Sequence, residues 1–277
     1  MEFYQIYRPL TAAPFKDNNI YMEYQPCSEL KPYIRCFWEM KKPSETLVIP
    51  DTCMDIMFDI NYSDNKIVST FCGINDTAFQ AALSDESHKL ISTFGIRFYA
   101  WAAVLFSEDS MEHVKNIYVN AEHYFGRLKK EIEELLFEAA DISSRIAITE
   151  KYLLKQIHPE RNNRIVMETV SRILLRKGNI KIFQLEQEVH TSSRQIERVF
   201  KEYVGISPKQ LSSLVRYQYL WNDIIYKRDF NILDEVHQLG YTDQAHLLRD
   251  FKRFHRMTPS EARNSAIKDV AFLQENI

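Results

Sequence analysis

The chain carries Arg194-Gln195-Ile196-Glu197-Arg198-Val199-Phe200-Lys201 ahead of Ser207-Pro208, and 51 residues later it carries Ala245-His246-Leu247-Leu248-Arg249-Asp250-Phe251-Lys252 ahead of Thr258-Pro259. In each copy an aliphatic residue lies four positions before a phenylalanine, so the two share one helix face, while the arginine between them points elsewhere. The repeat predicts one structural unit used twice, with an apolar face that packs and arginines that stay free.

Each repeated helix follows a shorter apolar pattern and a turn, within residues 185–192 and 232–243. Ser192 and Asp243 stand where an N-cap is needed, because their side-chain oxygens can accept hydrogen bonds from backbone N–H groups of the first turn. Gly240 gives the second turn a permissive backbone, whereas the first turn has His190 at that place. The pattern predicts helix, turn and helix, twice over.

Residues 179–263 resemble the DNA-binding domain of the AraC/XylS-type transcription regulators, a domain of seven helices that contains two helix-turn-helix units. The motifs that carry the resemblance stand here as Arg198-Val-Phe200-Lys201, Gly205-Ile-Ser207-Pro208, Gly240-Tyr241-Thr-Asp243, Ala245-His246, Arg249-Asp-Phe251-Lys252-Arg253 and Thr258-Pro259. Agreement at so many spaced positions implies a transcription regulator that binds double-stranded DNA. The helix expected from Pro208 to about Tyr226 would then hold both recognition helices against successive major grooves.

The balance of basic and acidic residues also differs between this C-terminal region and the rest of the chain. Residues 161–263 hold 18 lysines and arginines against 12 acidic residues, whereas residues 1–160 hold 16 against 24. A basic module on an acidic protein is typical of phosphate binding, and the acidic remainder discourages non-specific coating of DNA. A chance fluctuation of solvated charge is the alternative, and the motif spacing decides between them.

A recognition helix enters the major groove with its N-terminal turns, so exposed side chains there reach base edges while later basic ones reach phosphates. Arginine suits guanine, glutamine suits adenine, and glutamate accepts from cytosine. The expected base-reading residues are Arg194, Gln195, Glu197, Arg198, Gln244, Ala245, His246 and Leu248, and the expected backbone contacts are Lys201, Lys209, Arg249, Lys252 and Arg253. For any one arginine the alternative is a phosphate contact or an intradomain ion pair, such as Arg198 with Glu197 or Glu202.

Several positions depart from the family pattern. Glu186 and Val236 replace the small residue inside the first helix of each unit, His190 replaces the turn glycine, and Arg256 replaces a glycine before Thr258. A glutamate at a packing position needs a partner or solvent. These departures predict that one of the units binds DNA weakly.

Between Tyr21 and about Phe98 the chain breaks into short runs of β-forming residues, separated by Pro, Asn, Asp and Ser. The spacing predicts an antiparallel β-barrel or sandwich, so the chain is expected to be α+β, with an all-α C-terminal domain. Residues 47–58 and 94–102 resemble a cupin-like sensor branch of the same family, which implies a small-molecule effector. The expected pocket residues are Phe37, Trp38, Phe58 and Phe94, with Arg97 for an acidic group, against the alternative of an ordinary aromatic core with Arg97 exposed.

Helical periodicity follows from Met111 to Ile157, and the polar stretch from His158 to Asn163 reads as a linker. These helices are expected to cover the barrel and, as a hypothesis, to form a homodimer contact. The predicted division is a sensor domain in residues 1–107, linker helices in 108–160, the DNA-binding domain in 161–267 and a tail in 268–277.

Four cysteines, at positions 27, 36, 53 and 72, include no Cys-x-x-Cys pair, and they are expected to be ordinary buried thiols in a reducing cytosol. A metal site or a redox sensor is the alternative for these cysteines, but no metal or cofactor is expected. The chain has no apolar run of 18 residues and no signal-peptide pattern at Met1, which predicts a cytoplasmic protein without a membrane partner.

Two other function classes remain open. An enzyme would have to use Asp51, Cys53, Asp55, His88 or His113, but no catalytic motif orders them. A ligand-binding module whose DNA binding has weakened is the stronger alternative, and the repeated Arg-x-Phe-Lys motif stands against it. The sequence favours a transcription regulator, which would contact RNA polymerase if it is an activator.

Overall fold

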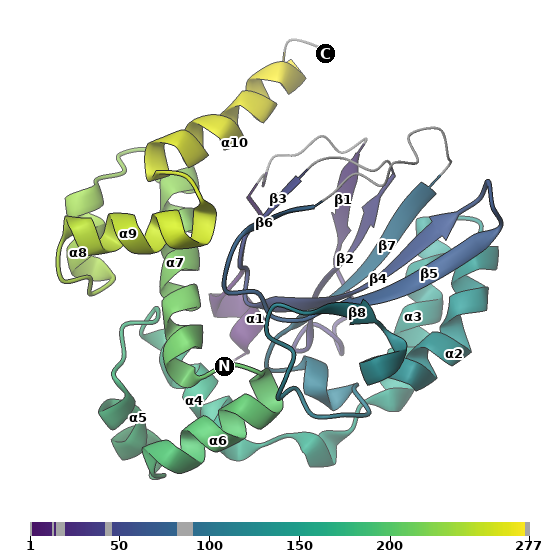
Figure 1. Ribbon diagram of the computed structural model, residues 1–277, viewed down its shortest axis with the longest axis horizontal. Coiled ribbons are helices and arrows are strands. Elements are labelled where there is room, and N and C mark those ends of the chain that lie inside the picture. Colours follow the sequence, from purple (N-terminus) through teal and green to yellow (C-terminus); the bar gives the residue numbers. More distant parts are fainter. Residues whose placement is uncertain (1, 13, 15–19, 42–45, 82–90, 275–277) are drawn as a thin grey trace.

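The computed structural model describes residues 2–12, 14, 20–41, 46–81 and 91–274 of the chain (Figure 1). It is a mixed α+β structure, as the sequence predicts. The described strands all lie within the first 120 residues, and helices make up most of the remainder. A short helix that the sequence did not predict, α1 (Phe3–Ile6), precedes the first strand.

Six strands form one antiparallel sheet in the order β1-β2-β7-β4-β5-β8, and β3 pairs with β6 in a smaller sheet. Their bounds are β1 (Tyr21–Tyr24), β2 (Ile34–Met40), β3 (Thr46–Val48), β4 (Cys53–Asn61), β5 (Lys66–Cys72), β6 (Phe79–Ala81), β7 (Ile91–Tyr99) and β8 (Tyr118–Asn120). Five of these strands coincide with the expected β-forming runs. Strand β8 lies inside the stretch expected to be helical from Met111, so the helical region begins later than predicted.

The two faces of the large sheet differ in chemistry because side chains alternate along each strand. Phe58 lies opposite Phe94, and Phe37 opposite Ile96, so one face is apolar and fully buried. The side chains that alternate with these point to the other face of the sheet. They include that of Asp55, which lies opposite Arg97. The three predicted phenylalanines therefore lie on one side of the sheet, and Trp38 and Arg97 lie on the other.

Two helices, α2 (Glu122–Glu138) and α3 (Ile142–Gln156), cover the apolar face of the sheet (Figure 1). The ring of Phe125 in α2 lies 6.0 Å from that of Phe98 and 5.1 Å from that of Phe71. Buried aromatic pairs of this kind stabilise a core beyond their area alone. The expectation that these helices cover the sheet is confirmed.

Seven helices follow in the C-terminal part: α4 (Arg164–Leu175), α5 (Ile182–Val189), α6 (Ser193–Val204), α7 (Pro208–Tyr226), α8 (Ile232–Gln238), α9 (Gln244–His255) and α10 (Pro259–Gln274). Helix α7 begins and ends at the predicted residues, since Ser207 caps it and Pro208 occupies its first turn. It stands between the pair α5–α6 and the pair α8–α9 (Figure 1).

Helix α7 is also joined to the N-terminal segment. The Gln218 side chain accepts a hydrogen bond from the backbone N–H of Leu10 at 2.8 Å and donates to the carbonyl of Pro50 at 2.6 Å. The indole of Trp221 donates to the Thr11 carbonyl at 2.9 Å. Because Gln218 is 2 % exposed, these bonds are shielded from water and fix the helix against the N-terminal half.

None of the described helices is long and apolar enough to cross a bilayer.

Candidate nucleic-acid interface

The first helix-turn-helix unit consists of α5, a turn at His190 and α6. His190 adopts a left-handed backbone with φ 53°, which a glycine would adopt more easily. Ser192 caps α6 by accepting from Gln195 N at 3.4 Å, and the Glu186 carboxylate accepts from Ser193 N at 2.6 Å. The hydrogen bond from Ser193 lowers the pKa of Glu186. The glutamate that departs from the family pattern therefore has a partner, because it caps the recognition helix.

Helix α6 buries Ile196 and Phe200 and turns its polar side chains outward, as predicted. Arg194 and Glu197 are exposed, and neither makes an ion pair with a described residue. Arg198 is exposed as well, but its guanidinium contacts Glu202 at 3.4 Å and Gln195 at 3.4 Å. Arg194 is thus the first-turn arginine of α6 whose donors are free to meet a base edge.

The second unit repeats this geometry in α8, Gly240 and α9. Asp243 caps α9 by accepting from His246 N at 2.7 Å. The side chains exposed on α9 are those of Gln244, Ala245, Arg249, Lys252 and Arg253, and Leu248 is half-buried. The Arg253 guanidinium lies 4.3 Å from the centre of the Phe254 ring, which leaves its charge at the surface.

His246 takes part in a contact network within the domain. Its ring meets that of Tyr241 edge-on at 5.2 Å, and its Nε2 lies 3.7 Å from the Asp250 carboxylate. Asp250 also pairs with Arg216 of α7 at 3.8 Å, and Arg216 lies over the Tyr241 ring at 4.4 Å. Sequence reasoning missed Arg216 and Asp250, which position α9 on α7, because the two residues lie far apart along the chain.

Beneath α9, a buried histidine joins the unit to α7. His255 is 1 % exposed, its ring stacks on Phe251 at 5.0 Å, and its Nδ1 lies 2.8 Å from the hydroxyl of Tyr217. Burial lowers the pKa of His255 to about 4, so the imidazole is neutral near pH 7 and its uncharged ring packs as part of the core. Helices α7 and α9 are therefore held together by aromatic packing as well as by the Arg216–Asp250 pair.

The predicted backbone contacts differ in their surroundings. Lys209 and Lys252 are exposed. Lys201 lies 3.4 Å from Glu112 of the N-terminal half, and the carbonyl of its neighbour Glu202 accepts a hydrogen bond from Met111 N at 2.7 Å. The C-terminal end of α6 therefore rests on the segment that joins β7 to β8.

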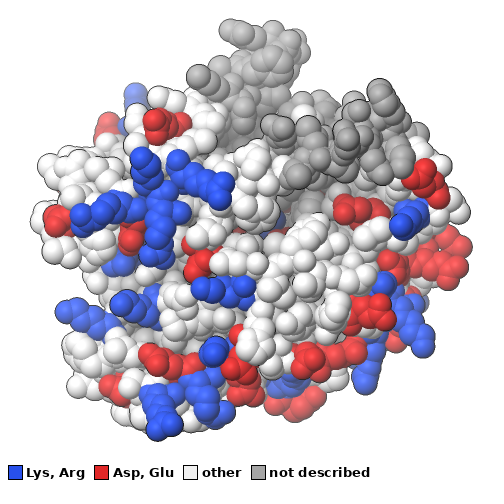
Figure 2. Space-filling view, viewed as in Figure 1, with Lys and Arg blue, Asp and Glu red and all other residues white. Residues whose placement is uncertain are grey.

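Positive charge gathers on one visible face of the C-terminal half. Figure 2 shows a group of lysine and arginine side chains over α9, and further basic side chains at the lower edge of the molecule, where Figure 1 places α5 and α6. The acidic side chains of the sheet half lie mainly toward the right of Figure 2. This distribution agrees with the charge division of the sequence and favours a polyanion as the partner of the helical half.

The five residues expected to line an effector pocket are not brought together. Phe37, Phe58 and Phe94 stack in the closed core, with ring centres 6.0 and 6.3 Å apart. On the opposite face, the Trp38 indole donates to Asp55 at 2.8 Å, and Arg97 Nε donates to the same carboxylate at 3.0 Å. Two cavities lie elsewhere, against Arg8 and Arg35, and none of the five residues lines either of them.

Of the groups that an enzyme or metal site would need, Asp51 and Asp55 are paired and Cys53 is buried, whereas His113 is exposed. Asp51 and Asp55 face Arg97 at 3.6 and 3.0 Å. Burial raises the pKa of Cys36 and of Cys72 to about 12, so neither thiol ionises near pH 7. His88, which the enzyme interpretation also names, lies outside the described residues. No group of three or more His, Cys, Asp or Glu side chains suited to a metal ion occurs in the part of the chain that the structure describes.

Two family models match the chain. Residues 185–265 match the model of a helix-turn-helix domain, and residues 22–120 match that of a domain of unknown function (DUF6597). A search of curated proteins found no match.

Several solved structures are similar to the chain. A probable AraC family transcriptional regulator from Rhodopseudomonas palustris is 24 % identical over 38 % of this chain and 98 % of its own, with a TM-score of 0.33. ToxT from Vibrio cholerae is 16 % identical over 81 % of this chain and 95 % of its own, with a TM-score of 0.40. A further ToxT structure, bound to an unsaturated fatty acid, is 12 % identical over 89 % and 95 %, with a TM-score of 0.39. Because these TM-scores are low, the similarities assign no role to an individual residue of this chain and no ligand to it.

The repeated Arg-x-Phe-Lys motif, the two capped helix pairs on α7 and the matched family model agree with one another. The C-terminal region of this chain is a helix-turn-helix domain of the AraC type, and the region before it belongs to a domain family of unknown function.

Proposed function

We propose that the chain is a sequence-specific DNA-binding transcription regulator and that α6 and α9 are its two recognition helices. One observation carries this proposal. Both helices bury their apolar faces, expose their N-terminal polar side chains, and are fixed to the same long helix α7. A rigid pair of recognition helices can enter two major grooves on one side of a duplex, which a single helix-turn-helix unit cannot do.

Within this proposal the side chains of the first turns read bases. Arg194 is the strongest candidate because it is exposed and unpaired among the described residues, and it would donate two hydrogen bonds to guanine. The other base-reading candidates are Gln195, Glu197, Arg198, Gln244, Ala245 and Leu248, of which Gln195 and Leu248 are half-buried. His246 would reach a base only by leaving its contacts with Tyr241 and Asp250.

Phosphate contacts come from the basic side chains farther along each helix. Lys209, Arg249, Lys252 and Arg253 are exposed and supply attraction that does not depend on sequence. Lys201 joins them when it leaves Glu112. The AraC-type family is one of transcription regulators, and under this proposal the chain has no catalytic role.

The N-terminal half serves as a sensor in this account, with residues 1–107 as the sensor domain, 108–160 as connecting helices, 161–267 as the DNA-binding domain and 268–277 as a tail. A small effector bound there would alter DNA binding through the contacts with α7. Leu135 and Leu154, which are 48 % and 44 % exposed on α2 and α3, offer an apolar surface for a homodimer. As an activator in the cytoplasm, the chain would also contact RNA polymerase.

Selection of bound duplexes from a random DNA pool tests the proposal, because the pool contains every short operator sequence. The expected result is an enriched motif with two blocks about 10.5 base pairs apart, one for each recognition helix. Enrichment of a single block would mean that one unit reads bases, as the departures at His190 and Arg256 suggest. If no motif is enriched, the alternative of a ligand-binding module with weakened DNA binding would replace this proposal.

A further inference from the structure

Two adjoining cavities lie where the N-terminal segment, the edge of the large sheet and α7 meet. The larger has a volume of about 490 Å³ and is lined by Arg8, Leu10, Tyr21, Glu23, Arg35 and residues of α7. The smaller, of about 90 Å³, is lined by Tyr4, Arg8, Lys31, Arg35 and Tyr99 among others. Small-molecule pockets usually have volumes of about 300–1,000 Å³, so the larger cavity has room for a small organic molecule.

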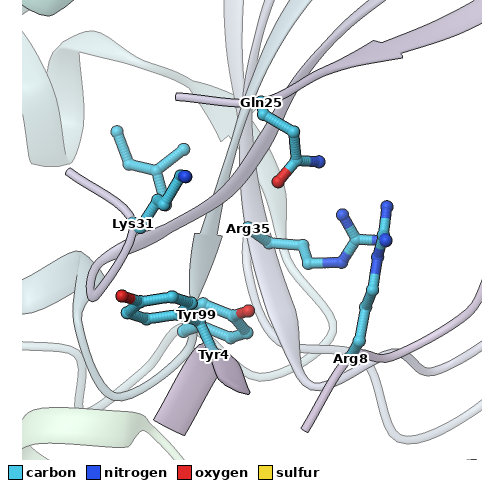
Figure 3. Close-up of a pocket in the computed structure, with 7 residues that line it drawn as sticks. Tyr4, Arg8, Gln25, Lys31, Arg35 and Tyr99 are labelled. Atoms are coloured by element: carbon cyan, nitrogen blue, oxygen red, sulfur yellow. The ribbon is translucent and has the colours of Figure 1, made fainter. Parts of the chain in front are cut away.

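The side chains of Arg8 and Arg35 reach the same end of the smaller cavity (Figure 3). Both residues line both cavities, so they mark the boundary where the two meet. Two guanidinium groups that converge repel one another unless an anion lies between them. Their placement favours a negatively charged group at this boundary.

Arg35 is buried and only partly paired. Its side chain is 6 % exposed, and its Nη2 lies 3.2 Å from Glu23 Oε2 and 3.5 Å from the Pro9 carbonyl. Its Nε and Nη1 are buried and have no hydrogen-bond partner in the described structure. A buried cationic donor without an acceptor is costly, because it has lost its water and gained nothing in exchange. The guanidinium therefore has N–H groups that can donate hydrogen bonds to the oxygen atoms of a ligand.

A local irregularity of the sheet directs Arg35 to this place. Ile34 lies opposite Phe98 and Cys36 opposite Arg97, so β2 advances two residues while β7 advances one, and Arg35 is the extra residue of a bulge. A bulge re-aims a side chain out of the regular alternation of the strand, and bulges are common beside functional sites. An ordinary strand residue at this position would have pointed to one of the two faces of the sheet.

The charge of the cavity walls sets the sign of the ligand. The residues that line the two cavities include three cations, Arg8, Lys31 and Arg35, and one carboxylate, that of Glu23. Arg35 holds the pKa of this carboxyl below its ordinary value against the effect of burial, so it stays ionised. The walls carry an excess of two positive charges within an N-terminal half that is otherwise acidic. This surplus favours an anion over a cation or a neutral molecule.

The larger cavity also reaches the DNA-binding domain, since Asn222 and Tyr226 of α7 line it. The cavity wall between Arg8 and Thr11 is the same segment that is hydrogen-bonded to Gln218 and Trp221. A ligand seated here would contact both the sensor half and the helix that carries the two recognition helices. If the N-terminal half and α7 can adopt two relative arrangements, a ligand that binds one arrangement more tightly increases the population of that arrangement.

We propose that this cavity is the effector site of the chain and that it takes a small organic anion, whose carboxylate or phosphate group pairs with Arg35 and Arg8. The assignment of a regulatory role rests on the proposed function, whereas binding of the anion does not. Leu10, Pro14 and Met22 supply apolar surface for the remainder of the molecule. The site differs in place and in residues from the aromatic pocket that the sequence suggested.

Thermal unfolding of the full chain tests anion binding without DNA. The probes are inorganic phosphate, acetate, hexanoate and decanoate, with sodium chloride at equal ionic strength and the matching primary alcohols as controls. At about 100 times its Kd, at least one anion is expected to raise Tm by about 5 °C or more, whereas its alcohol and chloride do not. Response to phosphate but to no carboxylate would identify a phosphate-type ligand. If none of the four anions raises Tm above chloride, the proposal is overturned.

Matched variants locate the site. Arg8→Gln and Arg35→Gln are expected to abolish the rise in Tm, and Arg127→Gln, which removes an exposed charge from α2, is expected to keep it. Arg8 is exposed, so its variant tests the site even if Arg35→Gln unfolds. If the anion still raises the Tm of Arg8→Gln and of any folded Arg35→Gln by the same amount, it binds elsewhere, and the assignment of this cavity is wrong.

The effect on DNA is measured separately, by anisotropy with a duplex selected from the random pool. The active anion should change Kd at least threefold for the natural chain and leave it unchanged for Arg8→Gln. Anion binding with no effect on Kd would refute the effector role but not the anion site. Absence of DNA binding with or without the anion would refute the proposed function, while the change in Tm would still report on the site.

Discussion

Lys201 on helix α6 lies 3.4 Å from Glu112, a residue of the segment that joins β7 to β8. Farther along the chain, Gly205 packs so closely on this segment that a Cβ there would lie 2.6 Å from the Met111 carbonyl oxygen. A residue expected to hold a DNA phosphate is thus paired with a carboxylate of the N-terminal half. Under the proposed function, DNA and Glu112 would compete for the same ammonium group.

Glu112→Gln should strengthen DNA binding, because it removes this competitor and one negative charge near the duplex. Exposed ion pairs contribute about 0–1 kcal/mol, so the expected gain in affinity is at most about fivefold. Lys201→Gln should instead weaken binding to all sequences alike and reduce the slope of log Kd against log salt by about one. The measurement is a salt titration with a single duplex. An unchanged salt slope for Lys201→Gln would show that Lys201 does not contact phosphate.

His190→Gly should stabilise the chain. His190 is exposed and adopts φ 53°, a backbone that costs an L-residue about 1 kcal/mol or more and a glycine nothing. Glycine also loses more entropy on folding, so the net gain expected in the free energy of unfolding is about 0.5–1 kcal/mol. Urea unfolding measures it. His237→Gly, in the right-handed backbone of α8, is the control and should cost about 0.3–0.5 kcal/mol. Destabilisation by both variants would contradict the turn geometry.

Stability should fall in mild acid because of His255. Burial lowers the pKa of this histidine to about 4 in the folded chain, against 6.5 when it is free. The unfolded chain therefore binds the extra proton first as the pH falls, and stability is lost progressively between about pH 6.5 and pH 4, by up to about 3 kcal/mol. His255→Phe should flatten the stability profile over this range in urea titrations at several pH values. A variant profile as steep as that of the natural chain would assign the loss to other groups.

The helix-turn-helix units could be predicted from the sequence because their signals are local. The period of Ile196 and Phe200 and the caps at Ser192 and Asp243 act within one or two helical turns. The bonds of Gln218 to Leu10 and Pro50 could not be predicted, since they join residues 208 and 168 positions apart.

For a related reason, the structure does not bring together the residues expected to line a ligand pocket. The aromatic residues Phe37, Phe58 and Phe94 were recognisable as apolar, but their side of the sheet depends on strand register, and helices α2 and α3 close that side. Arg35 gave no signal, because a single bulge between Ile34 and Cys36 decides where it points. The direction of a side chain at a β-bulge depends on how the strands pair, so it cannot be predicted from the sequence pattern alone.

Sequence-specific DNA binding can be measured by fluorescence anisotropy with DNA from the gene's own upstream region and with scrambled DNA. The titrations cover a range of salt concentrations, for the natural chain and Arg194→Ala. We expect tight, salt-dependent binding of the natural chain to its own DNA, and loss of about 1–3 kcal/mol of that preference in the variant. Equal and weak binding of both duplexes, with and without an anion that raises Tm, would contradict the proposed function.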